Sequence, residues 1–149
     1  MPDPGAPAAT HAAPLASPIH AILLAFPVAL YPSALISDIA YMQTAVIQWT
    51  NFSQWLIAGA DVFAGLLLAW ALVSFFVGRA RHAPGRGGLY LAAVALMFVL
   101  GVINAFQHSK DGWASVGATG VMLSIACTVL ALIAAFLVHS KAIVREVRP

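Results

Sequence analysis

The 149-residue chain has very little charge: Asp, Glu, Lys and Arg make up 8% of its residues, whereas 62% are hydrophobic. A soluble domain of this length carries about 25% charged residues. So small a chain cannot hide this much apolar surface in a water-soluble core, so lipid must cover much of it. The net charge of +2 is too small to indicate a nucleic-acid partner. We therefore expect an integral membrane protein whose main partner is the lipid bilayer.

Cysteine and the familiar catalytic motifs are also scarce. The single cysteine, Cys127, excludes an internal disulfide and lies in an apolar run, which indicates a small packing residue. The sequence has no phosphate loop, no GxSxG elbow, no HExxH and no CxxC. Hydrolytic and nucleotide chemistry therefore have no support, no catalytic residue can be named, and an enzyme is not favoured.

Basic residues are absent before Arg79, which argues against a signal peptide at the start of the chain. Residues 1–18 instead hold five of the nine prolines and few large apolar side chains, so we expect a disordered tail. Four long apolar stretches follow, at about 20–42, 54–77, 88–107 and 114–138. Each can cross a hydrocarbon layer of about 30 Å as a helix, and alternating strand patterns are absent. The sequence thus predicts an all-α, four-helix transmembrane domain over residues 19–140.

The basic residues orient this bundle. Arg79, Arg81 and Arg86 lie between the second and third spans, and three more basic residues lie in the short tail 141–149. Six of the seven Lys and Arg residues therefore share one side, which the positive-inside rule makes cytoplasmic. We expect a bacterial inner-membrane protein with both termini in the cytoplasm, residues 44–53 and 108–113 on the other side, and the three loop arginines at lipid headgroups.

Small and polar residues recur at helical spacing in each span and predict one interior-facing seam per helix. In the first span the seam comprises His20, Leu24, Pro27, Tyr31, Ala34 and Asp38. In the second it comprises Gln54, Ala58, Asp61 and Gly65, with Ala60 and Ala64 beside it. In the third it comprises Met97, Gly101, Asn104 and His108. In the fourth it comprises Gly117, Gly120, Ser124, Thr128 and Ala131.

Comparing depths along the spans gives two polar layers. The outer layer holds Asp38, Asp61, Asn104 and His108. The inner layer holds His20 and His139, near the cytoplasmic ends of the first and fourth spans, with His82 of the basic loop as a further candidate. Depth alone does not show which helices touch, so neither layer is yet a site.

The first span also carries a family pattern: His20, then Phe26–Pro27, then Asp38. With the three spans that follow, the basic middle loop and the basic tail, the chain resembles a bacterial membrane-protein family known as domain of unknown function 2231. The resemblance covers about residues 19–145, although Ala21 stands where the family usually has proline. It implies a four-helix integral membrane protein, and it implies no activity or cofactor.

Three functions remain open. The first is an accessory or structural subunit that packs against a membrane complex or forms a homo-oligomer. The second is a redox subunit linked to haem b or quinone, in which His20 and His139 ligate haem iron. The third is proton- or ion-linked transport that uses Asp38, Asp61 and His108, because ionisable residues inside a membrane are usually functional. The same three residues form no recognisable metal motif, so a metal is left unassigned.

Overall fold

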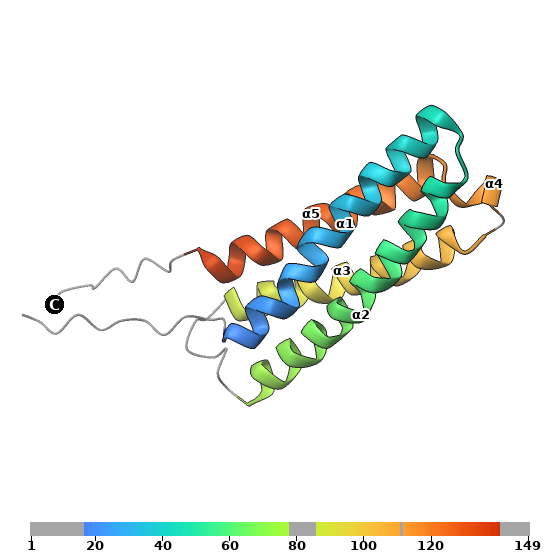
Figure 1. Cartoon of the computed structure of the whole chain (residues 1–149). Coiled ribbons are helices and arrows are strands. Elements are labelled where there is room, and N and C mark those ends of the chain that lie inside the picture. Colours follow the sequence, from blue (N-terminus) through green and yellow to red (C-terminus); the bar gives the residue numbers. More distant parts are fainter. Residues whose placement is uncertain (1–16, 78–85, 111, 141–149) are drawn as a thin grey trace, which may run out of the picture.

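The computed structural model describes residues 17–77, 86–110 and 112–140, which form four long helices and one short helix (Figure 1). The long helices are α1 (Pro18–Thr44), α2 (Gln48–Phe76), α3 (Arg86–His108) and α5 (Ala118–His139), and the short one is α4 (Gly112–Ser115). Each long helix has the length and apolar composition needed to cross a membrane. The predicted all-α, four-span fold is therefore confirmed.

Helix α1 begins where the sequence supplies a cap. The backbone N–H of His20 donates to the Ser17 hydroxyl at 3.3 Å, and Pro18 occupies the first helical position. An N-cap serine satisfies a backbone donor that has no partner in the helix, and proline has no donor to lose there. The start of α1 is thus set by local chemistry.

Pro27 and Pro32 lie inside α1 without ending it. Each proline lacks the N–H that would bond the carbonyl four residues earlier, which membrane helices tolerate when other groups satisfy the backbone. Two serines near Pro32 add hydrogen bonds to other carbonyls of α1. The Ser33 hydroxyl donates to the carbonyl of Ala29 at 2.8 Å, and the Ser37 hydroxyl donates to that of Ser33 at 2.9 Å.

The connection between α1 and α2 is short. It comprises residues 45–47, and α2 begins at Gln48, six residues before the predicted second span at about 54. Ala45 makes the turn in a left-handed conformation, with φ of 53°. The polar run before residue 54 is the first part of α2, where Thr50 and Ser53 are buried.

The fourth apolar stretch is interrupted rather than continuous from residue 114. Helix α4 ends at Ser115, and α5 begins at Ala118 after an extended Gly117, with φ of −149° and ψ of −164°. Val116 and Ser115 are buried beside this break. Helix α4 is therefore part of the connection between α3 and α5.

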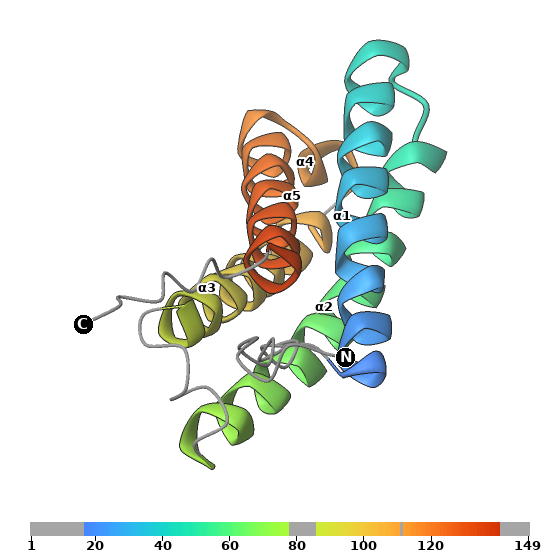
Figure 2. The ribbon, with the colours of Figure 1, turned by 90° about the vertical axis from the view of Figure 1, so that its left-hand side faces the viewer.

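The four long helices form a closed ring. Helix α1 packs against α2, α2 against α3, α3 against α5, and α5 against α1, with alternating directions (Figures 1 and 2). The first and last spans are thus neighbours, which depth alone did not show. The core between them consists mainly of small and aliphatic residues: Leu24, Tyr31, Ala60, Ala64, Leu67, Val94, Met97, Cys127, Ala131 and Ala134.

Most of the predicted seams face this core. All six seam residues of α1 are buried, as are the four of α3. In α5 Gly120, Ser124 and Ala131 are buried, but Cys127 takes the buried place predicted for Thr128, and Gly117 is half-buried. The prediction that Cys127 is a small packing residue is confirmed, because its side chain is fully buried and free.

The face of α2 that was predicted to be its seam is not the face that the helix buries. Its four residues are half-buried, whereas the buried face is Thr50, Ser53, Ile57, Ala60, Ala64, Leu67 and Ala71. The predicted flank of Ala60 and Ala64 is therefore the true seam. Gly65 lies instead against α3, where a Cβ would stand 3.1 Å from the Phe98 ring. The stripe through Asp61 thus follows the side of α2 that faces α3.

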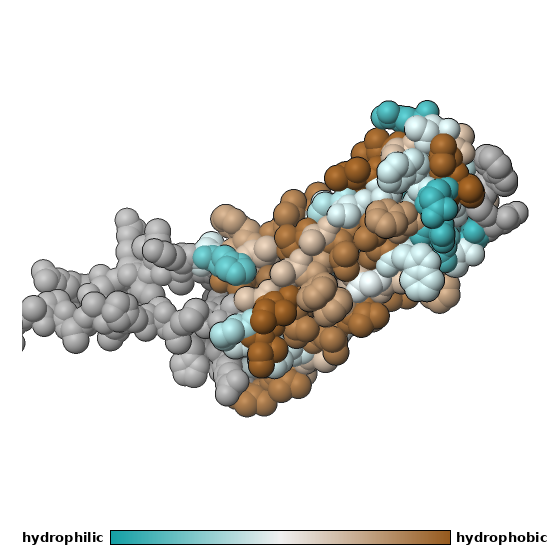
Figure 3. Space-filling model, in the orientation of Figure 1, coloured by the Kyte–Doolittle hydropathy of each residue, from teal (hydrophilic) through white to brown (hydrophobic). Residues whose placement is uncertain are grey.

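The outer surface of the bundle is apolar. Hydrophobic side chains cover the middle of the face shown in Figure 3, with polar residues concentrated toward the ends of the helices. Large side chains such as Trp55, Phe106 and Phe136 are each at least 70% exposed. In water this surface would be unfavourable, so it fits residence in a lipid bilayer.

Candidate functional site: a polar cluster that joins the four long helices

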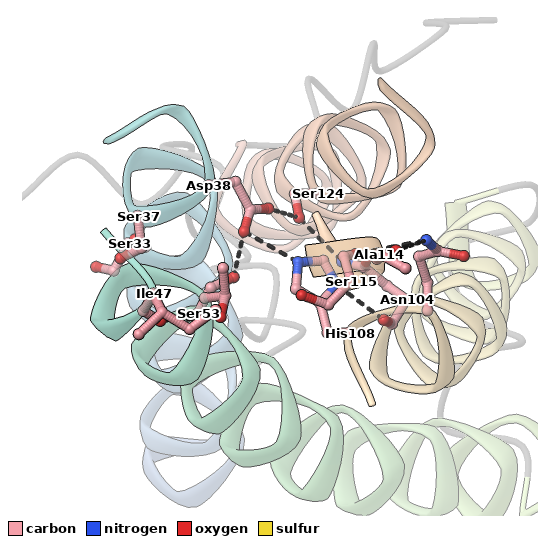
Figure 4. Close-up of polar contacts among 12 residues, drawn as sticks. Ser33, Ser37, Asp38, Ile47, Ser53, Asn104, His108, Ala114, Ser115 and Ser124 are labelled. Atoms are coloured by element: carbon pink, nitrogen blue, oxygen red, sulfur yellow. Dashed lines mark hydrogen bonds and ion pairs between the residues drawn. The ribbon is translucent and has the colours of Figure 1, made fainter. Parts of the chain in front are cut away.

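Asp38 is the centre of a buried polar cluster formed by all four long helices (Figure 4). Its Oδ1 accepts a hydrogen bond from the Ser53 hydroxyl of α2 and lies 2.9 Å from Nε2 of His108 in α3. Its Oδ2 accepts a hydrogen bond of 2.6 Å from the Ser124 hydroxyl of α5. We call Asp38, Ser53, Asn104, His108 and Ser124 the Asp38 cluster.

Asn104 extends the Asp38 cluster through the same serine. Its side-chain amide donates to the Ser124 hydroxyl oxygen at 3.0 Å, so Ser124 accepts one hydrogen bond and donates another. All five side chains of the cluster are at most 2% exposed. A polar network in a low-dielectric interior is stabilising when its members satisfy one another, and here side chains from three helices form hydrogen bonds with one carboxyl group from the fourth.

The hydrogen bonds of His108 restrict where its protons are. Nδ1 lies 3.0 Å from the backbone carbonyl oxygen of Asn104, and because a carbonyl only accepts, Nδ1 carries a proton. The contact between Nε2 and Asp38 then needs one further proton, which the nitrogen or the oxygen can hold. The pair is therefore either imidazolium with carboxylate or imidazole with carboxylic acid. Both forms have no net charge, which lowers the cost of burial.

Small residues of α5 make room for the His108 ring. A Cβ added to Gly120 would stand 3.3 Å from Cε1 of His108 and 3.3 Å from the backbone oxygen of Ser115. The glycine thus lets α5 approach the imidazole closely. Small residues at helix contacts have this effect generally in membrane bundles.

Asp61 does not join the Asp38 cluster, although the sequence placed it in the same outer layer. It accepts a hydrogen bond of 2.6 Å from the hydroxyl of Tyr31 in α1. Asp61 follows Ser53 by eight residues in α2, so it lies roughly 12 Å farther along the helix. The predicted outer layer is thus two sites: the Asp38 cluster and a separate Tyr31–Asp61 pair.

Gly101 makes the Tyr31–Asp61 pair sterically possible. A Cβ at this position of α3 would overlap both Oδ1 of Asp61 and the Tyr31 hydroxyl. The two side chains therefore occupy the space that a larger residue of α3 would fill. Tyr31 is fully buried, whereas Asp61 is half-buried.

His20 and His139 lie at the opposite end of the bundle on neighbouring helices. Nε2 of His20 lies 2.7 Å from the hydroxyl of Tyr90 in α3, and the His20 side chain is buried. His139 is exposed, and its Nδ1 lies 2.9 Å from the carbonyl oxygen of Ala135. His82, the further candidate of the inner layer, lies outside the described residues. Ligation of haem by this pair stays a prediction, and it would require His20 to give up Tyr90 or to use Nδ1. A Soret absorption that disappears on His20→Ala or His139→Ala would support it.

The structure describes little of the three arginines that are predicted to contact lipid headgroups. Arg79 and Arg81 lie outside the described residues, and Arg86 opens α3 without a described side chain. Lys110, at the other end, donates to the side-chain oxygen of Gln107 at 2.6 Å. Among the residues that the structure describes, no group of three or more His, Cys, Asp and Glu side chains could hold a metal ion.

The sequence did not identify Ser53 or Tyr90 as site residues. It placed Tyr31 in the seam of α1 but assigned it no partner. Ser53 was missed because it lay in the segment 44–53, just before the predicted second span. Its spacing of seven residues from Ala60, two helical turns, could have placed it on the same face. Tyr90 follows a glycine pair near the start of its span, and no sequence signal points from it to His20.

These observations define a class: an all-α integral membrane protein with four spans around a polar centre. Within it, the chain belongs to the family described as "Predicted membrane protein (DUF2231)", whose model matches residues 16–148. The family resemblance based on His20, Phe26–Pro27 and Asp38 is thus confirmed. No curated protein and no solved structure matches the chain.

Proposed function

We propose that the protein is a structural accessory subunit of the bacterial inner membrane, with both termini in the cytoplasm. It presents a preassembled four-helix unit to a larger membrane complex or to a second copy of itself. The observation that carries this proposal is the Asp38 carboxyl group, which forms hydrogen bonds with side chains of the other three long helices. A buried acceptor that uses its bonding capacity on neighbouring helices fixes their register and rotation.

Two further features support the proposal. Much of the rest of the interior consists of small residues such as Ala60, Ala64 and Ala131, which lets the helices approach closely, and many large apolar side chains lie outside. Arg79, Arg81 and Arg86 would hold the cytoplasmic end at anionic lipid headgroups. Such a unit needs no soluble domain to act as a membrane partner.

Photo-cross-linking in native membranes tests this role. A photoreactive amino acid at Phe106 or Phe136, both exposed, should give a discrete protein adduct of fixed mass. The same amino acid at Leu67, which is fully buried, is the matched control and should give only intramolecular products. Lipid adducts alone at several exposed positions around the bundle would contradict an accessory role.

A second candidate is proton- or ion-linked transport through Asp38, Asp61 and His108. The observation that favours it is the single proton that Asp38 and His108 must share. In proteoliposomes under a pH gradient, the protein should then carry a proton flux that Asp38→Asn lowers at least fivefold. Gly88→Ala, at an open surface position, is the control. Equal flux in protein-free liposomes would contradict this candidate.

A further inference from the structure

Helices α1 and α2 form an open groove on the outer surface of the bundle, which we call the α1–α2 groove. Its volume is about 350 Å³, within the range of about 300–1,000 Å³ that is usual for ligand sites. The side chains that line it are Leu23 of α1 and, from α2, Leu66, Ala69, Trp70, Val73, Ser74 and Val77. Leu66, Val73 and Val77 are each at least 50% exposed, so the groove opens to the outside of the bundle, which in a membrane is lipid.

The length and depth of the groove match one leaflet of a bilayer. From Val77 back to Leu66 is eleven residues of α2, roughly 16 Å, which is about half of a hydrocarbon layer of about 30 Å. Helix α2 has 29 residues and is thus roughly 43 Å long, so its ends extend beyond that layer. Val77, the C-cap residue of α2, therefore lies at a membrane surface, and Leu66 lies near the middle of the hydrocarbon.

The only polar side chains of the groove, Trp70 and Ser74, lie toward its surface end. They are one helical turn apart, six and two residues before the end of α2 at Phe76. Within the described part of the chain, neither the Trp70 indole N–H nor the Ser74 hydroxyl forms a hydrogen bond. A polar group that lies against hydrocarbon without a partner is costly, and tryptophan near a membrane surface can reach polar groups of the lipid. The groove thus combines apolar walls with two donors at the depth of lipid ester groups.

A lipid chain fits the groove better than two other occupants do. Residues 1–16 precede α1, but Met1 and Leu15 are their only large apolar side chains, too few to fill a groove of this kind. A second copy of the chain would need about 20–30 residues on each side for a stable interface, whereas seven residues line the groove. An acyl chain has the length of the groove, and its ester carbonyl oxygens are acceptors for the two donors.

We propose that the α1–α2 groove binds one acyl chain of a membrane phospholipid, whose ester carbonyl oxygens accept hydrogen bonds from Trp70 and Ser74. The chain then extends past Ala69 and Leu23 toward Leu66. This lipid differs from the surrounding lipid because it fills a concave surface and satisfies two donors. Its binding requires only that α1 and α2 span the membrane and is independent of the proposed accessory role.

Fluorescence quenching by a brominated lipid tests the site at Trp70. Two variants would each keep one tryptophan, Trp70 or Trp55, with the other three replaced by phenylalanine. Trp55 is the control, because it is 73% exposed and lies seven residues after the start of α2, much as Trp70 lies six before its end. In maltoside micelles, phosphatidylglycerol with dibrominated acyl chains should quench Trp70 at a lipid-to-protein ratio at least fivefold lower than Trp55. Equal ratios for the two tryptophans would overturn the proposal.

A dibrominated alkane of the same chain length tests the hydrogen bonds, because it lacks ester groups. It should quench Trp70 and Trp55 at similar ratios. Quenching of Trp70 by the alkane at the low ratio expected for the phospholipid would overturn the assignment of Trp70 and Ser74 as donors to ester carbonyls.

Filling the groove should displace the lipid. Ala69→Phe puts a ring into the groove, and Ala92→Phe makes the same change at an exposed position of α3. In native mass spectrometry of protein purified from its membranes in maltoside, the unmodified chain and Ala92→Phe should retain one phospholipid, and Ala69→Phe at least fivefold less. Equal retention in Ala69→Phe, an isoprenoid quinone in place of the phospholipid, or a lipid-free dimer would each overturn the proposal. Circular dichroism identifies an Ala69→Phe protein that unfolds, and quenching of Trp70, which leaves the groove intact, then decides.

Discussion

An ionised aspartate at the centre of a membrane helix costs about 2.5–3.5 kcal/mol when it has no partner. Asp38 has three, each from a different helix, and Asp61 has Tyr31. The carboxyl groups of Asp38 and Asp61 therefore act mainly through hydrogen bonds, which determine where the neighbouring hydroxyl groups and the imidazole lie. The small residues beside them are equally specific, because Gly101 and Gly120 lie where polar side chains of other helices need space.

Replacement of Gly101 by alanine should destabilise the bundle. The added Cβ would overlap Asp61 and the Tyr31 hydroxyl, so the pair must separate or α3 must shift. Overpacking of this kind costs about 1–3 kcal/mol. Unfolding by SDS in mixed micelles, followed by circular dichroism, measures the loss. Gly88→Ala is the matched control, because nothing lies within 4 Å of its Cβ position, and equal stability of the two variants would refute the contact.

Cys127 should react very slowly with a maleimide in the folded protein. Its side chain is fully buried, and it is the only cysteine of the chain, so the labelling rate reports this position alone. We expect labelling at least tenfold slower in mild detergent than in SDS. A rate in mild detergent equal to that of the SDS-denatured protein would place Cys127 on the outside and contradict the rotation of α5.

At the scale of single elements, most helix rotations follow from the sequence and one does not. In α1, α3 and most of α5, small and polar residues recur every three or four positions among large apolar ones, so the interior face is distinct. In α2 two such stripes run side by side, one through Asp61 and one through Ala60 and Ala64. The prediction for α2 is wrong because it turns the charged stripe inward, whereas Tyr31 and Gly101 accommodate Asp61 at the edge of the interface.

Insertion of one alanine after Ala34 tests the phase of α1. One added residue rotates everything beyond it by about 100°, so Asp38 would leave the cluster while His20 and Tyr31 stay in place. We expect a loss of stability in SDS unfolding and faster labelling of Cys127. One alanine inserted after Ala6, in the N-terminal segment, is the control. A stable insertion variant with protected Cys127 would contradict the view that α1 is held by both polar sites.

At the scale of the whole molecule, the sequence predicts four spans, because a helix that crosses lipid must present long apolar stretches to the hydrocarbon. The partners of Asp38 could not be predicted from one sequence, since the ring order of the helices depends on contacts between segments far apart in the chain. Asn104 and His108 were correctly placed at the depth of Asp38. Ser53 was not, because polar residues at a membrane surface resemble a loop whether or not they are helical.

Reporter fusions test the orientation, which rests on the positive-inside rule. Alkaline phosphatase joined after Arg81 should be inactive and green fluorescent protein at the same site fluorescent, since that loop is expected in the cytoplasm. Fusions after Lys110 should give the reverse pattern. Activity of phosphatase after Arg81 would place the arginines outside and reject the proposed orientation.

The central claim is that Asp38 joins the four long helices through its hydrogen bonds, and a double-mutant cycle measures this most directly. The free energy of unfolding would be determined for Asp38→Ala, Ser124→Ala and the double variant. We expect a coupling energy of about 0.5–3 kcal/mol between these bonded residues. Asp38→Ala with Tyr90→Phe is the reference pair, because Tyr90 is 18 residues, roughly 27 Å, from His108 along α3. That pair should be additive within about 0.5 kcal/mol. Additive effects of Asp38→Ala and Ser124→Ala would contradict the claim.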